Sequence, residues 1–398
     1  MMKEMWIAKN KCTGCGACEN ICPRTAISMK SDECGFIYPE ISIEKCVNCN
    51  MCEKICNARL EIKSNNYSEP LTYAAWSGNA DTRFTSTSGG VFTELSTRII
   101  EKGGYVAGAL YNKENLVEHF LVNDLEGLTK LKQSKYIQSN AKLIYKQVKD
   151  KLDDNNLVAF CGAPCQIAAL YAYLGKEYDN LFTFDFICRG MNSPKAYKSW
   201  LKEIEEKYGG KACKVWFKYK EDGWKKSPRC IRIDFDNNSN IVLKGNENLF
   251  MSGYLDYNLY IRPSCSNCDF KGVPRISDIT LADFWGVHSS VDDDKGTSMV
   301  LCNSDKGGML FDEIKPNIDF YERNFIEILG GNQSFTSSVW INKKSSEFLK
   351  MLDIDSFSSA FKKYAKKPLQ LKIKSLTVKL YQRVKSGIKR IINFNKKK

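Results

Sequence analysis

Short apolar runs alternate with amphipathic stretches through the middle of the chain, a pattern typical of a mixed α/β domain. A longer amphipathic stretch predicts a helix that runs to Tyr208, with Ser193 as its N-cap and Pro194 at its first position. Further helices are expected at 91–101 and 166–174, strands at 73–76, 105–111, 157–160 and 181–187, and a hairpin from 215–220 and 231–235.

The first 60 residues break this pattern, because they contain nine cysteines and an internal repeat. Residues 11–22 and 45–56 are two copies of one motif, and each copy reads C-x2-C-x2-C-x3-C. The polar segment 61–72 that follows is typical of a linker. One N-terminal domain made of a duplicated half-domain is therefore predicted for residues 1–60.

The spacing within each copy is that of 4Fe-4S ligands. Three cysteines placed two residues apart can wrap three corners of a cubane cluster, and in two-cluster ferredoxins the fourth cysteine ligates the other cluster. Structural zinc instead favours paired C-x2-C knuckles with a longer spacer, so zinc is disfavoured. The first cluster is assigned to Cys12, Cys15, Cys18 and Cys56, and the second to Cys46, Cys49, Cys52 and Cys22. The segment resembles bacterial-type two-cluster ferredoxins.

The residues between the cysteines suit a chain that curls around a cluster. Gly14 and Gly16 match Asn48 and Asn50 in the repeat, and Gly and Asn tolerate a positive φ. Proline follows the first copy, whereas Asn57 stands at that position in the second. This departure is expected to change the turn and its access to solvent without removing a ligand.

Composition limits the remaining chemistry. The chain has 17 Cys and only 2 His, so general acid–base chemistry by histidine is disfavoured. It begins without the apolar core of a signal peptide and has no apolar run long enough to span a bilayer. A cytoplasmic location is expected, where cysteines are more often metal ligands or reactive thiols than disulfides.

The positive charge lies in the C-terminal tail. Residues 361–398 hold 14 Lys and Arg and no acidic residue, while the net charge of the whole chain is +13. The body is thus nearly neutral, which argues against nucleic-acid binding. Apolar residues recur at helical spacing between Leu369 and Ile391. This tail is expected to form either a peripheral helix at the inner membrane surface or a helix docked on the body.

A second group of cysteines lies in the larger domain. Cys161, Cys165 and Cys188 fall at the expected ends of strands, where ligands bind in α/β domains. Cys265 and Cys268 form a C-x2-C pair. Six short pieces that occur in order are Ser88-Gly-Gly-Val-Phe92, Ser134-Lys-Tyr136, Gly162-Ala-Pro-Cys-Gln166, Cys188-Arg-Gly190, Cys265-Ser-Asn-Cys268 and Asp283-Phe-Trp-Gly286. Together they resemble the coenzyme F-420 hydrogenase/dehydrogenase β-subunit family.

This resemblance implies FAD and a third 4Fe-4S cluster. The matching cluster ligands are Cys165, Cys188, Cys265 and Cys268, whereas Cys161 lies one step outside the family pattern and is expected to be a packing thiol. No G-x-G-x-x-G motif is present, so a Rossmann site is unsupported. A flavin is expected instead at the Ser-Gly-Gly turn that opens a helix. Its candidate contacts are Ser88, Gly89, Gly90, Lys135, Asp283 and Trp285.

The sequence thus predicts an α+β or mixed α/β protein: a ferredoxin-like domain with two clusters, a larger flavin-binding α/β domain over 73–155 and 156–330, an extension over 331–360, and a basic C-terminal helix. We expect an oxidoreductase that passes electrons from a ferredoxin-like donor or a partner redox subunit through clusters to FAD. The alternatives are a non-catalytic electron-transfer subunit and a redox-sensing iron–sulfur protein. No residue identifies the substrate or a catalytic group.

Overall fold

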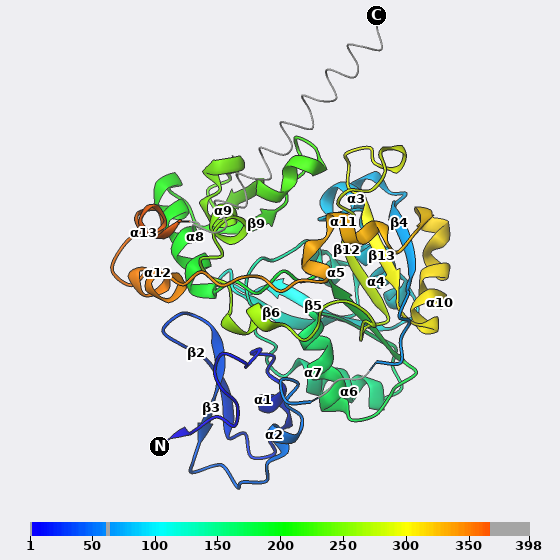
Figure 1. The fold of residues 1–398 in the computed structure, drawn as a ribbon. Helices are drawn as coiled ribbons and strands as arrows, with labels where there is room; N and C mark the ends of the chain where they lie inside the picture. Colours follow the sequence, from blue (N-terminus) through cyan, green and yellow to red (C-terminus); the bar gives the residue numbers. More distant parts are fainter. Residues whose placement is uncertain (1, 61–63, 367–398) are drawn as a thin grey trace, which may run out of the picture.

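The N-terminal module is a small sheet with the cysteine loops beside it. A computed structural model describes residues 2–60 and 64–366. The expected tail helix between Leu369 and Ile391 lies outside these residues. Figure 1 shows the module in blue, with β1 (Met2–Lys3), α1 (Ala17–Ile21), β2 (Ile27–Ser31), β3 (Ile37–Ser42) and α2 (Met51–Lys54). Its three strands are antiparallel in the order β1-β3-β2.

The larger domain is built on one eight-stranded sheet in the order β14-β4-β13-β12-β8-β7-β5-β6. The four central strands β12, β8, β7 and β5 are parallel, and the strands outside them pair antiparallel. The bounds are β4 (Leu71–Ser77), β5 (Tyr105–Tyr111), β6 (Val117–Val122), β7 (Val158–Cys161), β8 (Leu181–Phe186), β12 (Ile279–Asp283), β13 (Ser298–Cys302) and β14 (Ile318–Arg323). The fold is therefore mixed α/β, as predicted.

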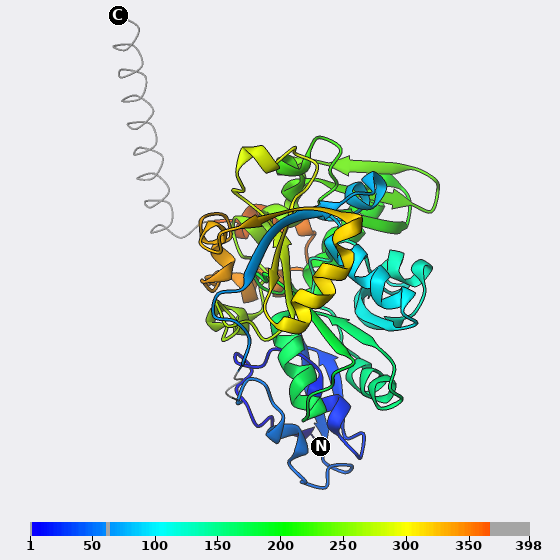
Figure 2. The same cartoon turned by 90° about the vertical axis from the view of Figure 1, so that its right-hand side faces the viewer.

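Helices cover both faces of this sheet, because successive strand residues point to opposite sides. Ala159 packs with α4 (Val91–Glu101), α5 (Leu125–Leu131) and α10 (Asp305–Ile314), whereas its neighbours Val158 and Phe160 pack with α6 (Ile144–Asp153) and α7 (Pro164–Leu174). Figure 2 shows α10, in yellow, lying along the sheet. The central strands are thus buried on both sides and offer a site only at their ends.

A second core lies between another three-stranded sheet, β11-β10-β9, and the C-terminal helices. The sheet has the antiparallel order β11-β10-β9, and Phe217 and Trp200 lie in its core. Its elements and the remaining helices are α3 (Ala80–Thr85), α8 (Pro194–Tyr208), β9 (Ala212–Phe217), β10 (Ile231–Phe235), β11 (Asn240–Leu243), α9 (Leu249–Leu255), α11 (Glu327–Gly331), α12 (Ser345–Met351) and α13 (Phe357–Tyr364). Short 3-10 turns span Trp224–Arg229, Gly245–Glu247, Pro263–Asn267, Ser289–Val291, Lys315–Asn317 and Gln333–Phe335.

Most of the predicted elements are present. The helix at 91–101 and the strand at 105–111 are confirmed, and Ser193 caps α8 by accepting a hydrogen bond from the Lys195 amide. The predicted hairpin is confirmed as β9 and β10, but its first strand ends at Phe217 rather than at residue 220. The reason is that Lys218 has a φ of +56°, which turns the chain out of the extended conformation.

The N-terminal module packs directly on the helices that cover the lower face of the sheet in Figure 1. Helix α1 contacts α6 and α7. The Tyr145 hydroxyl donates to the Cys15 carbonyl over 2.8 Å, and the Asn20 amide donates to the Lys142 carbonyl over 2.6 Å. The first cysteine loop is thereby held against α6. None of the helices among the described residues is long and apolar enough to cross a membrane.

A buried ion pair fastens the loop before β12 to β8. Arg275 and Asp185 pair over 2.6 Å with side chains 4% and 0% exposed, and Asp185 also accepts from the Thr280 hydroxyl. Arg275→Met would leave this buried carboxylate without its cation, so we expect the free energy of unfolding to fall by about 3–5 kcal/mol. Anaerobic chemical denaturation followed by circular dichroism measures this loss.

The matched control is an exposed pair on the same domain. Lys130 and Glu126 pair at the surface, where water screens the charges, so Lys130→Met should leave the stability unchanged within error. Equal losses in Arg275→Met and Lys130→Met would contradict the importance assigned to the buried pair.

Candidate iron–sulfur sites and the adjoining cavity

Two sets of four cysteines lie in the N-terminal module, grouped as the repeat predicts. We call Cys12, Cys15, Cys18 and Cys56 the middle set, and Cys22, Cys46, Cys49 and Cys52 the outer set. Burial, together with the charges of Cys12 and Cys56, raises the pKa of Cys15 to about 11. Burial and then the charges of Cys22, Cys49 and Cys46 raise the pKa of Cys52. In each set the thiols thus lie close enough to repel one another as thiolates.

The backbone of both loops turns as expected from the repeat. Gly14 and Gly16 have φ values of +66° and +81°, and Asn48 and Asn50 have φ values of +55° and +58°. The Ala26 amide donates to the Cys22 sulfur over 3.2 Å, a contact of the kind that tunes cluster ligands. Residues that tolerate a positive φ are therefore required at equivalent points of the two copies.

A third set of four cysteines, the inner set, gathers in the larger domain: Cys165, Cys188, Cys265 and Cys268. All four line one small cavity of about 50 Å³, and Cys188 also lines the large cavity described below. Burial and then the charges of Cys188, Cys268 and Cys265 raise the pKa of Cys165 well above its usual value. The Met191 amide donates to the Cys265 sulfur over 3.4 Å.

The donor chemistry of these three sets suits clusters. Buried thiols that raise one another's pKa become thiolates only when cations compensate their charge, which bound iron does. Among the described residues, no three His, Cys, Asp or Glu side chains lie close enough together to hold a single metal ion. A cubane cluster spreads its four ligands around a larger core than one ion does.

Two buried polar side chains connect the middle set to the inner set. Asn57, 3% exposed, donates to the Cys165 carbonyl over 2.6 Å and accepts from the Thr13 hydroxyl over 3.2 Å. Arg262, fully buried, donates through Nε to the Cys12 carbonyl over 2.9 Å. Asn57 occupies the position where the first copy has proline, so the departure noted in the sequence is a link between the two domains.

A large cavity opens beside the inner set, at the carboxyl ends of the parallel strands. Its volume is about 590 Å³, within the range of ligand pockets. Cys161 at the end of β7, Cys188 beyond β8 and Asp283 at the end of β12 all line it. It shares the segment 188–191 with the small cavity of the inner set. The two cavities therefore adjoin.

Five of the six expected flavin contacts line this cavity: Ser88, Gly90, Lys135, Asp283 and Trp285. Gly89 instead lies against β4, where an added Cβ would sit 2.4 Å from the Ala75 carbonyl oxygen. The Lys135 ammonium donates to carbonyls at the end of α5, among them those of Leu131 and Lys132 at 2.8 and 2.6 Å. Its donors are thus already used, and burial lowers its pKa to about 7.

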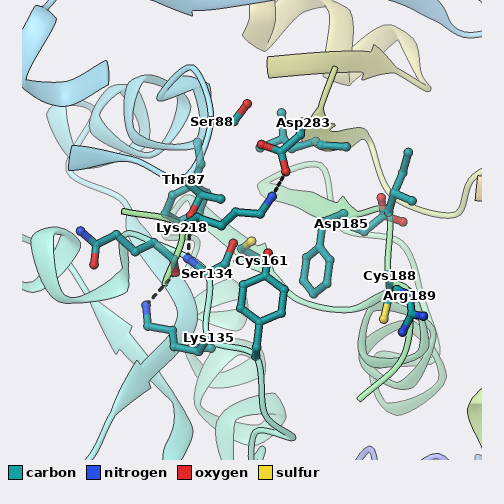
Figure 3. Close-up of a pocket in the computed structure, with 18 of the residues that line it drawn as sticks. Thr87, Ser88, Ser134, Lys135, Cys161, Asp185, Cys188, Arg189, Lys218 and Asp283 are labelled. Atoms are coloured by element: carbon teal, nitrogen blue, oxygen red, sulfur yellow. Dashed lines mark hydrogen bonds and ion pairs between the residues drawn. The ribbon is translucent and has the colours of Figure 1, made fainter. Parts of the chain in front are cut away.

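Sequence reasoning missed Lys218, which also lines the cavity. Figure 3 shows its side chain pointing at Asp283, with which it forms a buried ion pair. Burial opposes the charge of Lys218, but the Asp283 carboxylate outweighs it and raises the lysine pKa. The ammonium lies 5.1 Å from the centre of the Trp285 ring, which stacks on Trp224 at 4.3 Å. Only its positive φ sets this lysine apart, and the sequence does not show that.

Two family models match the chain. Residues 11–59 match the 4Fe-4S dicluster domain, and residues 155–326 match the model for the C terminus of the coenzyme F420 hydrogenase/dehydrogenase beta subunit. No curated protein matches the chain significantly. Among solved structures, a chain of the F420-reducing NiFe hydrogenase complex from Methanosarcina barkeri is similar, with 16% identity and a TM-score of 0.45. The similarity covers 68% of this chain and 93% of that chain.

The two matched segments contain the three cysteine sets, and they agree with the resemblance drawn from short motifs alone. The protein is an iron–sulfur electron-transfer protein of oxidoreductase type, in which a 4Fe-4S dicluster domain precedes a domain related to the C terminus of the coenzyme F420 hydrogenase/dehydrogenase beta subunit.

Proposed function

We propose that the chain is an iron–sulfur flavoprotein that conducts electrons from a one-electron donor, past the outer, middle and inner cysteine sets, to FAD in the large cavity. The observation that carries this proposal is that the small cavity of the inner set and the large cavity share one stretch of wall, residues 188–191. Electron transfer between a cluster in the small cavity and a flavin in the large one needs the two cavities to be close. Two sites with unrelated roles would not need to share a wall.

The outer set is the proposed point where electrons enter. Cys49 is exposed, whereas Cys18 in the middle set is buried. Val47 and Met51, beside Cys49, are 59% and 39% exposed, which is unusual for large apolar side chains. These features suit transient contact with a ferredoxin-like donor or a partner redox subunit.

The middle and inner sets lie next to each other. Cys15 is close enough to Cys165 for its charge to raise the pKa of that thiol, and Asn57 bonds directly to the Cys165 backbone. With four thiols on one small cavity, the inner set has the donor group of a third 4Fe-4S cluster. The chain's own residues hold the sets in sequence, and the clusters, when bound, supply the one-electron chemistry.

The large cavity offers FAD a set of unsatisfied polar groups. Ser86 and Thr93 are 7% and 6% exposed, line the cavity, and have hydroxyl groups without a hydrogen-bond partner in the described chain. They flank the N-terminus of α4, whose free amides and dipole favour a phosphate. Lys220 donates to the Ser88 carbonyl over 2.8 Å and fixes this turn. FAD, when bound, would connect one-electron with two-electron chemistry.

The third unsatisfied group is His119, which lies on β6 and is 5% exposed. Its ring stacks on the Phe160 ring, with the ring centres 5.5 Å apart. Neither nitrogen of the His119 ring has a hydrogen-bond partner among the described residues, because the nearby Cys161 backbone does not reach it with good hydrogen-bond geometry. Burial lowers its pKa to about 4, so the ring is neutral and offers one donor and one acceptor to a ligand.

We expect anaerobically purified protein to contain about 12 iron atoms and one FAD per chain, since three sets hold four irons each. Cys268→Ser removes one inner ligand and should lower the iron content to about 8, with the flavin retained. Iron analysis and the flavin released on denaturation measure both. The same variant should stop a reduced ferredoxin from bleaching the flavin absorbance.

Cys161→Ser is the matched control, because Cys161 lines the large cavity but not the small one. It should keep the full iron content and fast flavin reduction. About 8 irons in the wild-type protein would contradict the third cluster, and the absence of flavin would contradict the proposal and favour the sensor alternative. Substrate turnover by the isolated chain would separate an enzyme from a non-catalytic subunit.

A pH dependence follows from the neutral His119. Its folded pKa of about 4 lies below the ordinary value near 6.5, so the unfolded chain binds more protons between these values. The contribution of the neutral His119 ring to the free energy of unfolding is complete above about pH 6.5. It is lost as the pH falls towards 4, by up to about 1.4 kcal/mol per pH unit. His119→Phe should therefore lose less thermal stability than wild type between pH 7 and pH 5.5.

The other histidine, His288, is exposed and serves as the control. His288→Phe should keep the wild-type pH dependence of the denaturation midpoint, measured anaerobically at one scan rate. An identical pH dependence in His119→Phe and wild type would show that His119 is not held neutral by the fold.

A further inference from the structure

Three arginines are buried among the described residues, and one of them has no carboxylate partner. Arg83 pairs with Asp293 and Arg275 with Asp185. Arg262 is the most deeply buried, at 0% exposure, yet it forms no ion pair with any described residue, and its Nη2 has no hydrogen-bond partner. A buried guanidinium without a counter-charge costs several kcal/mol, and the described part of the chain supplies no such partner.

Arg262 contacts the middle set through its side chain and the inner set through its backbone. Its Nε bonds to the Cys12 carbonyl, and its Nη1 bonds to the Gln138 side chain over 3.0 Å. A Cβ added at Gly14 would lie 2.8 Å from Nη1, so the guanidinium touches the loop of the middle set. On the other side, its backbone carbonyl accepts from the Cys265 amide over 3.0 Å.

Aromatic rings cover the remaining face of the group. The Arg262 guanidinium lies 4.2 Å from the centre of the Tyr38 ring and 5.7 Å from that of Phe36. Such contacts stabilise a cation but bring no negative charge. They also exclude water, so the field of the guanidinium is weakly screened on the side of the cysteines.

We propose that Arg262 is the counter-charge of the clusters held by the middle and inner sets, and that it raises their reduction potentials relative to that of the outer set. This inference rests on the proposed function. When bound, a cluster would accept one electron from the donor on reduction and would gain one negative charge, with no bond formed or broken. A fixed buried cation therefore stabilises the reduced state more than the oxidised state. The effect draws electrons inward from the outer set towards the cavity.

The test is a redox titration of the full-length protein with dithionite, followed by electron paramagnetic resonance. Arg262→Gln removes the charge and keeps amide donors at the site. At a fixed potential it should lower the reduced-to-oxidised ratio of the middle and inner clusters by at least about tenfold, which is 59 mV for one electron. The outer cluster, which Arg262 does not touch, should keep its potential and act as an internal reference.

A second variant neutralises the charge without removing the arginine. Gln138→Glu is nearly isosteric and would place a carboxylate on Nη1. It should lower the same two potentials, whereas Arg262→Lys, which keeps the charge, should not. The control is Arg59→Gln: the Arg59 amide donates to the Cys56 carbonyl, but its guanidinium is exposed and pairs with Glu53. Its loss should leave all the potentials unchanged.

The outcomes separate this inference from the proposed function. Wild-type potentials in iron-replete Arg262→Gln and Gln138→Glu would overturn the role of Arg262. If Arg262→Gln fails to bind iron, the Arg262→Lys variant provides the test. Wild-type iron content and potentials in Arg262→Lys would support a role for the positive charge. Loss of iron in Arg262→Lys would overturn that role and favour a steric one. Two clusters in the wild-type protein would refute the inner cluster, yet the middle cluster would still test Arg262.

Discussion

Two buried polar bridges hold the N-terminal module against the larger domain, and the order of the cysteine sets depends on them. Asn57 connects the segment after Cys56 to the Cys165 backbone, and Arg262 connects Cys12 to the segment of Cys265. Buried polar groups require partners, so these bonds define one relative position of the two domains rather than a sliding contact. A mobile carrier domain would not need such bonds.

The eight-stranded sheet determines the position of the innermost sites, the inner cysteine set and the large cavity. Its four central strands are parallel and buried on both faces, so binding is restricted to their carboxyl ends. There Cys188 lines both cavities, and the ion pair of Lys218 and Asp283 lines the large one. The inner cysteine set and the proposed flavin site thus both lie at one edge of this sheet, with the N-terminal module docked beside it.

Much of this arrangement could be predicted from local sequence patterns. The cysteine spacing determines the middle and outer sets because the ligand loops are short, and the positive φ of Asn48 and Asn50 follows from their match to Gly14 and Gly16. Strand ends and a C-x2-C pair marked the inner cysteines as candidates, but only resemblance to a family joined them into one set, since they come from three separate segments. Long-range contacts explain what was missed: Lys218 is paired with Asp283, and the role proposed for Arg262 depends on the lack of a carboxylate beside it among the described residues. The role of Asn57 as a link between the domains could not be predicted either, because its partner Cys165 is more than one hundred positions away.

The central claim is that three iron–sulfur sites run in sequence from an exposed loop to the cavity. Anomalous diffraction at the iron edge, from crystals grown anaerobically, tests it most directly. The account predicts three compact iron peaks, the last enclosed by Cys165, Cys188, Cys265 and Cys268, with the middle peak lying between the other two. Two iron peaks with four free thiols at the inner set, or a middle peak remote from Arg262, would contradict it.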